Sequence, residues 1–218
     1  MGLRQSEHKI SLMALYLVTM IMRAAFYITI AVIQSNLYLG GNVQGWETSA
    51  VLVIYPLAEL STVSFFGSYS DKIGRKPILT ASLFITGLAT LLFAVTPAAI
   101  YMLAFAILFG IGAASKVTTT LSMIADCSLE DNRARLMGYY DLSTLMGLAG
   151  GYGLGILLLQ FGFAPMNILL VASAAVFVSG FITFFAISET RIETCVDTSM
   201  IDLLKEVAKD KRVQMMLP

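Results

Sequence analysis

Long apolar runs separated by short polar segments set the hydropathy pattern of this 218-residue chain. Six of the runs reach about the 20 residues that a helix needs to cross the hydrocarbon core of a bilayer. They cover residues 10–38, 46–70, 77–96, 98–125, 134–161 and 164–188. The pattern predicts an all-α membrane protein, a bundle of six transmembrane helices. We expect residues 1–190 to form this domain and residues 191–218 to follow it as a cytoplasmic linker.

The expected linker has a helical pattern of its own. Ser199 is placed to cap a short helix. Ile201, Leu204 and either Val207 or Ala208 then form one apolar stripe, which predicts a helix lying on the membrane surface. The closing residues 213–218 resemble the start of a seventh span.

Polar segments that carry cations alternate along the chain with polar segments that carry none. The cations are Arg4, Lys9, Lys72, Arg75, Lys76, Arg133, Arg135 and those from Arg191 onward. By the positive-inside rule, this alternation places both termini in the cytoplasm. We therefore expect a multi-pass protein of the cell membrane, surrounded by the lipid bilayer.

Composition excludes several classes of protein. The chain is 57% hydrophobic and 13% charged, and its mean hydropathy is +0.80, values that belong in a bilayer. Its net charge of zero gives no electrostatic case for binding nucleic acid. Cys127 and Cys195 both fall in segments expected to be cytoplasmic, so we expect no structural disulfide.

We also expect no enzyme activity, cofactor or metal site. The sequence has no nucleotide-binding loop, no cluster of metal ligands and no nucleophile constellation within the spans. The only histidine, His8, lies outside them.

A polar, basic stretch, Gly67 to Lys76, joins the second and third apolar runs. We expect it to be a cytoplasmic turn in which Gly67 allows close helix packing and Gly74 adopts a positive φ. Its pattern, G-x-x-x-D-R/K-x-G-R/K-R/K, resembles the signature loop between helices 2 and 3 of major facilitator superfamily transporters. Asp71, Arg75 and Lys76 occupy the charged positions of that motif.

The resemblance covers the whole chain, which is similar to the N-terminal half of such a transporter. It implies two inverted three-helix repeats and transport by alternating access. It also implies a second six-helix half, from the same gene, another subunit or a second copy. Arg75 and Asp126 would form a cytoplasmic lock, and Asp71 would face the positive end of a helix in the other half. Arg133 joins this set, although Ala134 replaces the usual glycine.

Two spans carry further packing signals. Residues 77–96 have no charge and few polar groups, which suits a helix that faces lipid. Gly147, Gly151 and Gly155 lie at four-residue spacing on one helix face, which predicts close approach of a neighbouring helix.

Three ionisable residues stand out within the spans: Arg23, Glu59 and Lys116. A charge at a helix centre costs roughly 2.5–3.5 kcal/mol on insertion scales, so these side chains are not expected to face lipid. One interpretation is a structural ion pair between Arg23 and Glu59. The other is functional, with Glu59 as the proton-coupling carboxylate.

Counting these three residues leaves one positive charge in excess, which favours an anionic substrate. We expect Arg23 and Lys116 to bind a small organic anion, and Tyr27, Gln34 and Tyr152 to contact its uncharged part. The sequence thus predicts a secondary transporter for a small solute, coupled to protons.

Alternative functions remain open. Proton-coupled drug exporters of the superfamily carry G-x-x-x-G-P-x-x-G-G in the fifth helix, where this chain has Tyr152 for the proline and Ile156 for the last glycine. The oligopeptide branch carries E-x-x-E-R-F-x-Y-Y in its first helix, where Thr19 and Met22 replace the two acids. A non-transporting six-helix receptor or scaffold is a further alternative.

Overall fold

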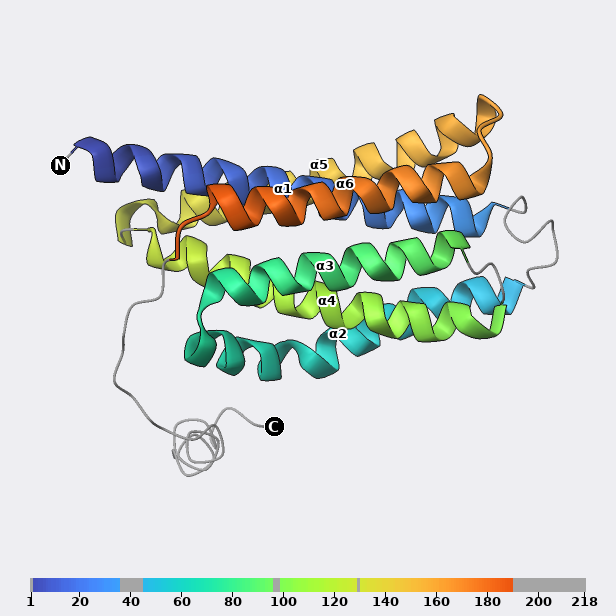
Figure 1. Ribbon diagram of the computed structural model, residues 1–218, viewed down its shortest axis with the longest axis horizontal. Coiled ribbons are helices and arrows are strands. Elements are labelled where there is room, and N and C mark those ends of the chain that lie inside the picture. Colours follow the sequence, from blue (N-terminus) through green and yellow to red (C-terminus); the bar gives the residue numbers. More distant parts are fainter. Residues whose placement is uncertain (1, 36–44, 96–98, 129, 190–218) are drawn as a thin grey trace, which may run out of the picture.

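The computed structural model describes residues 2–35, 45–95, 99–128 and 130–189. Within these residues the regular structure is helical, in six helices long and apolar enough to cross a membrane. They are α1 (Gly2–Gln34), α2 (Gly45–Ile73), α3 (Arg75–Val95), α4 (Ala99–Asp126), α5 (Glu130–Gln160) and α6 (Pro165–Ala186), shown in Figure 1. The predicted all-α membrane bundle is confirmed. The linker expected at 191–218, with Cys195 and Ser199, lies outside the described residues.

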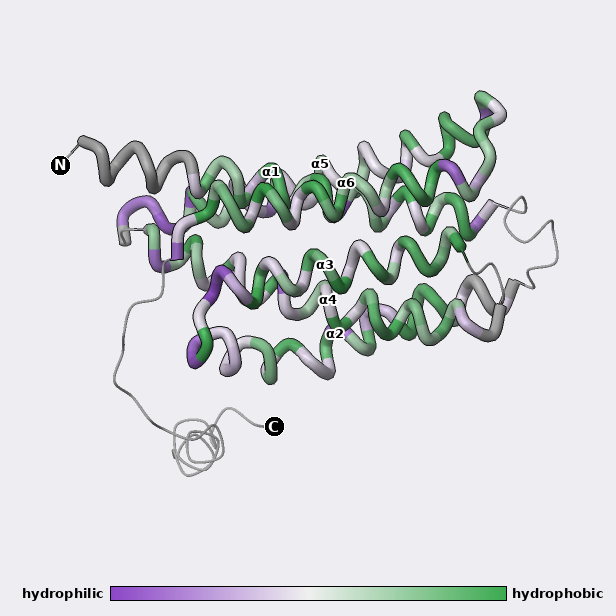
Figure 2. Tube along the Cα trace, in the orientation of Figure 1, coloured by the Kyte–Doolittle hydropathy of each residue, from purple (hydrophilic) through white to green (hydrophobic). Residues whose placement is uncertain are grey.

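The helices run back and forth, so alternate connections gather at the same end of the bundle (Figure 1). We call the end that holds the α2–α3 turn and the C-terminal ends of α4 and α6 the basic end. Lys72, Arg75, Lys76, Arg133 and Arg135 lie in or next to these segments. Figure 2 shows hydrophilic residues near the helix ends and hydrophobic residues along the middle, as expected for helices in a bilayer.

Helix α1 packs against α5 and α6, α2 packs against α4, and α3 packs against both α4 and α6. The α1–α5 contact is made through glycine. A Cβ atom at Gly147 would lie 2.6 Å from the carbonyl oxygen of Met20, and one at Gly151 would overlap the carbonyl oxygen of Ala24. The predicted close approach along this glycine face is therefore confirmed, and α1 is the partner helix.

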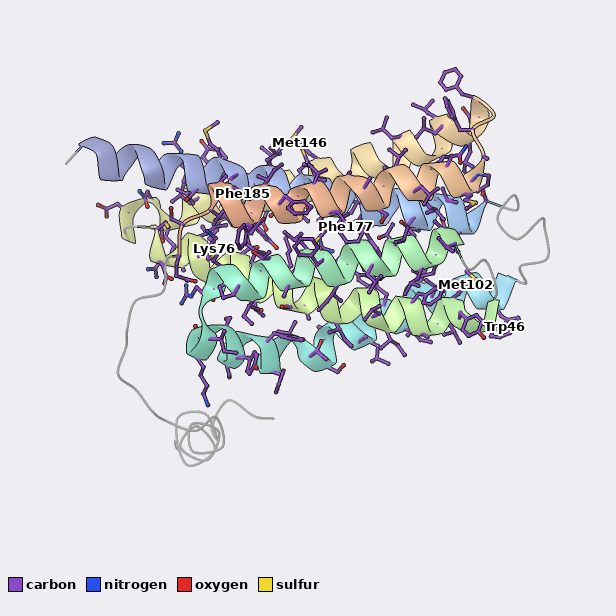
Figure 3. All side chains as sticks on the ribbon, viewed as in Figure 1. Trp46, Lys76, Met102, Met146, Phe177 and Phe185 are labelled. Atoms are coloured by element: carbon purple, nitrogen blue, oxygen red, sulfur yellow. The ribbon has the colours of Figure 1, made fainter. Side chains whose placement is uncertain are left out.

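The structure limits the expected lipid-facing surface of residues 77–96 to one side of α3, where Leu88 and Val95 are exposed. One face of α3 is buried, and Leu79, Leu83 and Thr86 are fully enclosed. Phe177 of α6 lies against Gly87, where a Cβ atom would be 3.2 Å from the ring; Figure 3 labels this side chain. A uniformly apolar span has the same composition whether it meets lipid or protein, so hydropathy could not reveal this packing.

Helices α2 and α5 are the least covered. Only 11% and 17% of the residues in their most apolar stretches are buried, against at least 44% in the other four helices. These two helices therefore present most of their apolar surface to whatever surrounds the chain.

The turn between α2 and α3 is shorter than predicted, because α2 continues to Ile73 and α3 begins at Arg75. Gly74 is the single non-helical residue between them, with φ of +121°, as the sequence predicted. The polar residues before it continue the α2 hydrogen-bond ladder beyond the apolar span. The expected close packing at Gly67 is wrong within the described residues, since a Cβ atom there would meet nothing within 4 Å.

Candidate functional site

Three polar side chains meet near the middle of the bundle. Nη1 of Arg23 on α1 donates a hydrogen bond to the Tyr55 hydroxyl at 3.0 Å, and Nη2 lies 3.7 Å from Oε1 of Glu59 on α2. The Arg23 and Glu59 side chains are 15% and 16% exposed. The geometry expected for an Arg23–Glu59 ion pair is therefore present.

Aromatic rings hold Tyr55 in this position. Its ring centroid lies 4.2 Å from that of Phe26 and 5.8 Å from that of Phe109. Gly110 on α4 lets α2 come close, because a Cβ atom there would lie 2.5 Å from the carbonyl oxygen of Tyr55. The phenol is thus fixed where its oxygen can accept a hydrogen bond from Arg23.

Lys116 on α4 is fully buried. Its ammonium lies 5.1 Å from the ring centroid of Tyr140 on α5, a cation–π arrangement. Its Nζ has no hydrogen-bond partner among the described residues, and neither has the buried Oγ1 of Thr120 one turn further along. A buried polar group without a partner is rare, and for a cation it is expensive.

A second polar pair lies toward the opposite end of the bundle. The Tyr152 hydroxyl on α5 donates a hydrogen bond to Oε1 of Gln34 on α1 at 2.8 Å. The two helices enclose a groove of about 420 Å³ lined by Ala31, Gln34, Ser35, Tyr152, Ile156, Leu159 and Gln160. We call this the outer groove.

The predicted substrate-binding residues therefore divide into two groups. Gln34 follows Arg23 by eleven residues, about 16 Å along the helix axis. We call Arg23, Glu59 and Lys116 the central cluster. Arg23 and Lys116 thus lie in the central cluster, and Gln34 and Tyr152 line the outer groove. Tyr27 lies between these levels on α1, with its ring centroid 5.2 Å from that of Phe26.

At the basic end, Arg75 joins two acids. Its Nη1 forms an ion pair with Oδ2 of Asp126, and its Nη2 lies 3.4 Å from Oδ1 of Asp71, whose side chain is 62% exposed. Arg133 instead donates from Nε to the Ser128 hydroxyl at 3.1 Å. We call Asp71, Arg75 and Asp126 the Arg75 cluster. Its geometry brings together three of the residues predicted for the cytoplasmic lock.

Glu189, which the sequence analysis did not single out, caps α3. Its Oε1 accepts a hydrogen bond from the backbone N–H of Arg75 and its Oε2 one from that of Lys76, both at 3.0 Å. These N–H groups open a helix and have no partner within it, so a carboxylate there satisfies both and complements the helix dipole. The signal was an acid placed directly after the sixth apolar run.

Asp141 on α5 was also missed. It lies inside the predicted span 134–161, yet the count of charged residues omitted it. Its side chain is exposed, and it has no ion-pair partner within the part of the chain that the structure describes.

The comparisons with known proteins now decide the family. The family model described as Major Facilitator Superfamily matches residues 12–214. The chain belongs to the major facilitator superfamily. Both the family and the fold are those of transporters that carry small solutes across membranes, rather than of enzymes.

Among the proteins that resemble this member of the superfamily are one curated relative and one solved structure. "Multidrug resistance protein 2" of Bacillus subtilis (strain 168) is 28% identical over 149 residues, which is 65% of this chain and 36% of that protein. The crystal structure of a bacterial homolog of the human lysosomal transporter Spinster, inward-facing and unoccupied, matches with a TM-score of 0.70 and 15% identity. It is matched by 93% of this chain, which spans 49% of it. The chain thus spans about half of that transporter and about a third of the curated relative.

Proposed function

We propose that this chain, together with a second six-helix half, is a secondary transporter that carries a small organic anion across the cell membrane by alternating access, with proton coupling and both termini cytoplasmic. The observation that carries the proposal is Lys116. Its ammonium is fully buried and meets no acceptor among the described residues.

Charge pairing supports an anionic substrate. Arg23 already faces Glu59, so within this central cluster Lys116 is the cation without an acid beside it. Isolated burial of an ammonium costs several kcal/mol, and a carboxylate or phosphate would offset that cost. The Nε of Arg23 also lacks a hydrogen-bond partner among the described residues, so the guanidinium keeps donor capacity for an anion.

The low coverage of α2 and α5 supports a second half, because an interface would cover the apolar surface that these helices present. The source of that half is open between the same gene, another subunit and a second copy. We expect residues 1–218 to catalyse no uptake into liposomes as demonstrated monomers. Uptake by such monomers would contradict this part of the proposal.

The substrate class can be tested by thermal unfolding of the purified full assembly, because a ligand that binds the folded state raises its Tm. Benzoate, benzylamine and benzyl alcohol form a matched set with negative, positive and neutral charge on one ring. We expect benzoate to raise the Tm and the other two to leave it unchanged. Lys116→Gln should remove the benzoate shift, and Lys72→Gln, a change to an exposed cation outside the cluster, should keep it. A rise in Tm with benzylamine and not with benzoate would overturn the proposal that the substrate is an anion.

Drug export is the second candidate function, favoured by the similarity to a protein named for multidrug resistance. In this case the charges of the central cluster would form structural pairs, and the second half would determine which substrates bind. Efflux of a cationic dye from cells that express the full protein, with no stabilisation by benzoate, would favour it. A receptor or scaffold would show neither transport nor dependence on an ion gradient.

Proton coupling was assigned from the sequence to Glu59, and that assignment stays a prediction. The short distance to Arg23 supports the structural alternative equally, in which the pair joins α1 to α2. Glu59→Gln should abolish gradient-driven accumulation and keep exchange if Glu59 carries the proton.

A further inference from the structure

Asp141 lies well inside the membrane-spanning part of α5. Gly147 marks the level of Arg23, since a Cβ atom at Gly147 would lie 2.8 Å from the Cβ of Arg23. Asp141 precedes Gly147 by six residues, about 9 Å along the axis toward the basic end. It is therefore an acid within a span rather than at its end.

Helical geometry places Asp141 on the same side of α5 as the outer groove. Asp141 and Tyr152 are eleven residues apart, which is about three turns, so they lie almost on one line along the helix. Tyr152 lines the outer groove with Gln34. The carboxylate thus stands on the side of α5 that faces the groove, about 16 Å nearer the basic end.

Other acids of the bundle face a cation. Glu59 faces Arg23, and Asp126 faces Arg75. Asp141 is exposed and has no cation within 4 Å among the described residues. A carboxylate inside a span requires water, a cation or a proton, because lipid provides none of these.

Four charges from four helices surround Tyr140. Asp141 is the residue after Tyr140 on α5, and Arg23 of α1 and Glu59 of α2, which face each other at 3.7 Å, are near enough to influence the charge balance around Tyr140. Lys116 of α4 lies against the ring. Counted together, these groups carry two positive and two negative charges, so the cluster is neutral when Asp141 is ionised. The excess positive charge that favoured an anion appears only when Asp141 is protonated.

We infer that Asp141, rather than Glu59, carries the coupling proton, and that its protonation recruits the anion to Lys116 and Arg23. The inference rests on the proposed function. The proton adds to a carboxylate oxygen of Asp141 on one side of the membrane, which raises the cluster charge from zero to plus one. A monovalent anion then neutralises it. Departure of the anion and loss of the proton to water on the other side restore the starting state.

The pH dependence of benzoate binding tests this assignment. Benzoate stays ionised between about pH 6 and pH 8, so a change in affinity over that range belongs to the protein. The affinity of the full assembly for benzoate should fall as the pH rises, by up to about tenfold per pH unit, because only the protonated protein carries the excess positive charge. Asp141→Asn, which is permanently neutral, should bind benzoate with the same affinity at both pH values. Asp131→Asn, which alters an exposed acid of the same helix nearer its start, should retain the wild-type pH dependence.

Transport in liposomes separates a coupling role from a structural one. Asp141→Asn should lose at least about ninety per cent of proton-driven benzoate accumulation and keep benzoate–benzoate exchange. Asp141→Glu should keep both. Pairing with a cation of the second half would instead make Asp141→Asn lower the Tm without changing coupling, and that result overturns the inference.

The outcomes are distinguishable. Benzoate stabilisation that is independent of pH in the wild type leaves the proposed function standing and overturns the role of Asp141. The role of Asp141 is also overturned if Glu59→Gln abolishes proton-driven accumulation and keeps exchange, while Asp141→Asn keeps both. Absence of stabilisation by benzoate in the wild type contradicts the proposed function itself, and the inference falls with it.

Discussion

Arg75 is the residue on which the contacts of the basic end converge. Its guanidinium meets Asp126 and Asp71, and its backbone N–H meets Glu189. Arg75→Ala would leave the Asp126 carboxylate, whose side chain is only 16% exposed, without this cation. We expect a loss of roughly 1–3 kcal/mol in the free energy of unfolding.

The same substitution should raise the accessibility of the basic end to thiol reagents and change the transport rate of the full assembly. Lys72→Ala, which removes an exposed cation two residues before Gly74, is the matched control. If both Arg75→Ala and Asp71→Asn leave accessibility and transport unchanged, the Arg75 cluster only helps to orient the chain in the membrane and does not act as a lock.

Cys127 offers a pH-dependent readout at the same end. Burial raises the pKa of this thiol above its usual value, and the neighbouring Asp126 raises it further. Because the thiolate is the reactive form, maleimide labelling should be slow at neutral pH and accelerate about tenfold per pH unit toward the pKa. A Cys195→Ala background leaves Cys127 as the one thiol of the chain.

Labelling of that variant is compared with a small thiol over the same pH range. The labelling rate of Cys127 should rise at a higher pH than that of the small thiol. If Cys127 reacts over the same pH range as the small thiol, or a lower one, the thiol is neither buried nor next to the Asp126 carboxylate.

At this scale the sequence predicted part of the site. The positive φ of Gly74 follows from residue type, and the partner of Arg75 followed from the resemblance to the superfamily. Glu189 escaped because its partners are backbone N–H groups more than 110 residues away, and no side-chain pattern records such a contact. Asp141 was visible in the sequence, but its exposure on the groove side of α5 required the structure.

Among the elements, the α1–α5 pair has the tightest contact described above, made of backbone against backbone. Gly151→Ala should therefore disrupt it, because the added methyl group would overlap Ala24. Overpacking of this kind costs roughly 1–3 kcal/mol. The adjacent Gly150 is the control, since a Cβ atom there meets nothing within 4 Å.

Thermal unfolding of the two variants in detergent checks the prediction. Gly150→Ala should match or exceed the wild-type Tm, because alanine favours a helix over glycine by about 1 kcal/mol. Equal Tm values for Gly150→Ala and Gly151→Ala would mean that α1 and α5 do not approach as closely as described.

Hydropathy predicted each helix to within several residues, because span length is set by the bilayer. It could not predict which faces are buried. The serines and threonines of α3 are buried. Several donate a hydrogen bond from the side-chain hydroxyl to the backbone carbonyl three or four residues earlier, as Thr86 does to Ser82. Hydroxyl groups of this kind find their hydrogen-bond acceptor within the same helix, so the side chains can pack in the interior like small apolar groups.

For the whole molecule, orientation in the membrane is the open expectation that is simplest to test. The cation-bearing connections gather at one end of the bundle, and the positive-inside rule assigns that end to the cytoplasm. An impermeant maleimide added to intact cells should therefore label neither cysteine until the cells are permeabilised. Modification of Cys127 in intact cells would place the basic end outside the cell and contradict the proposed topology.

The one-residue corner at Gly74 affects how motion passes between α2 and α3. Its φ lies in the left-handed region, and Glu189 holds the first N–H groups beyond it, so few degrees of freedom remain between α2 and α3. Where this corner keeps its angle, α2 and α3 move together as the two arms of one bracket. With 21 residues at a rise of 1.5 Å, α3 is about 31 Å long, so rotating the bracket by about 5° carries the far tip of α3 through about 3 Å. A tilt too small to break any contact at the basic end would thus become a displacement of atomic size at the opposite membrane face.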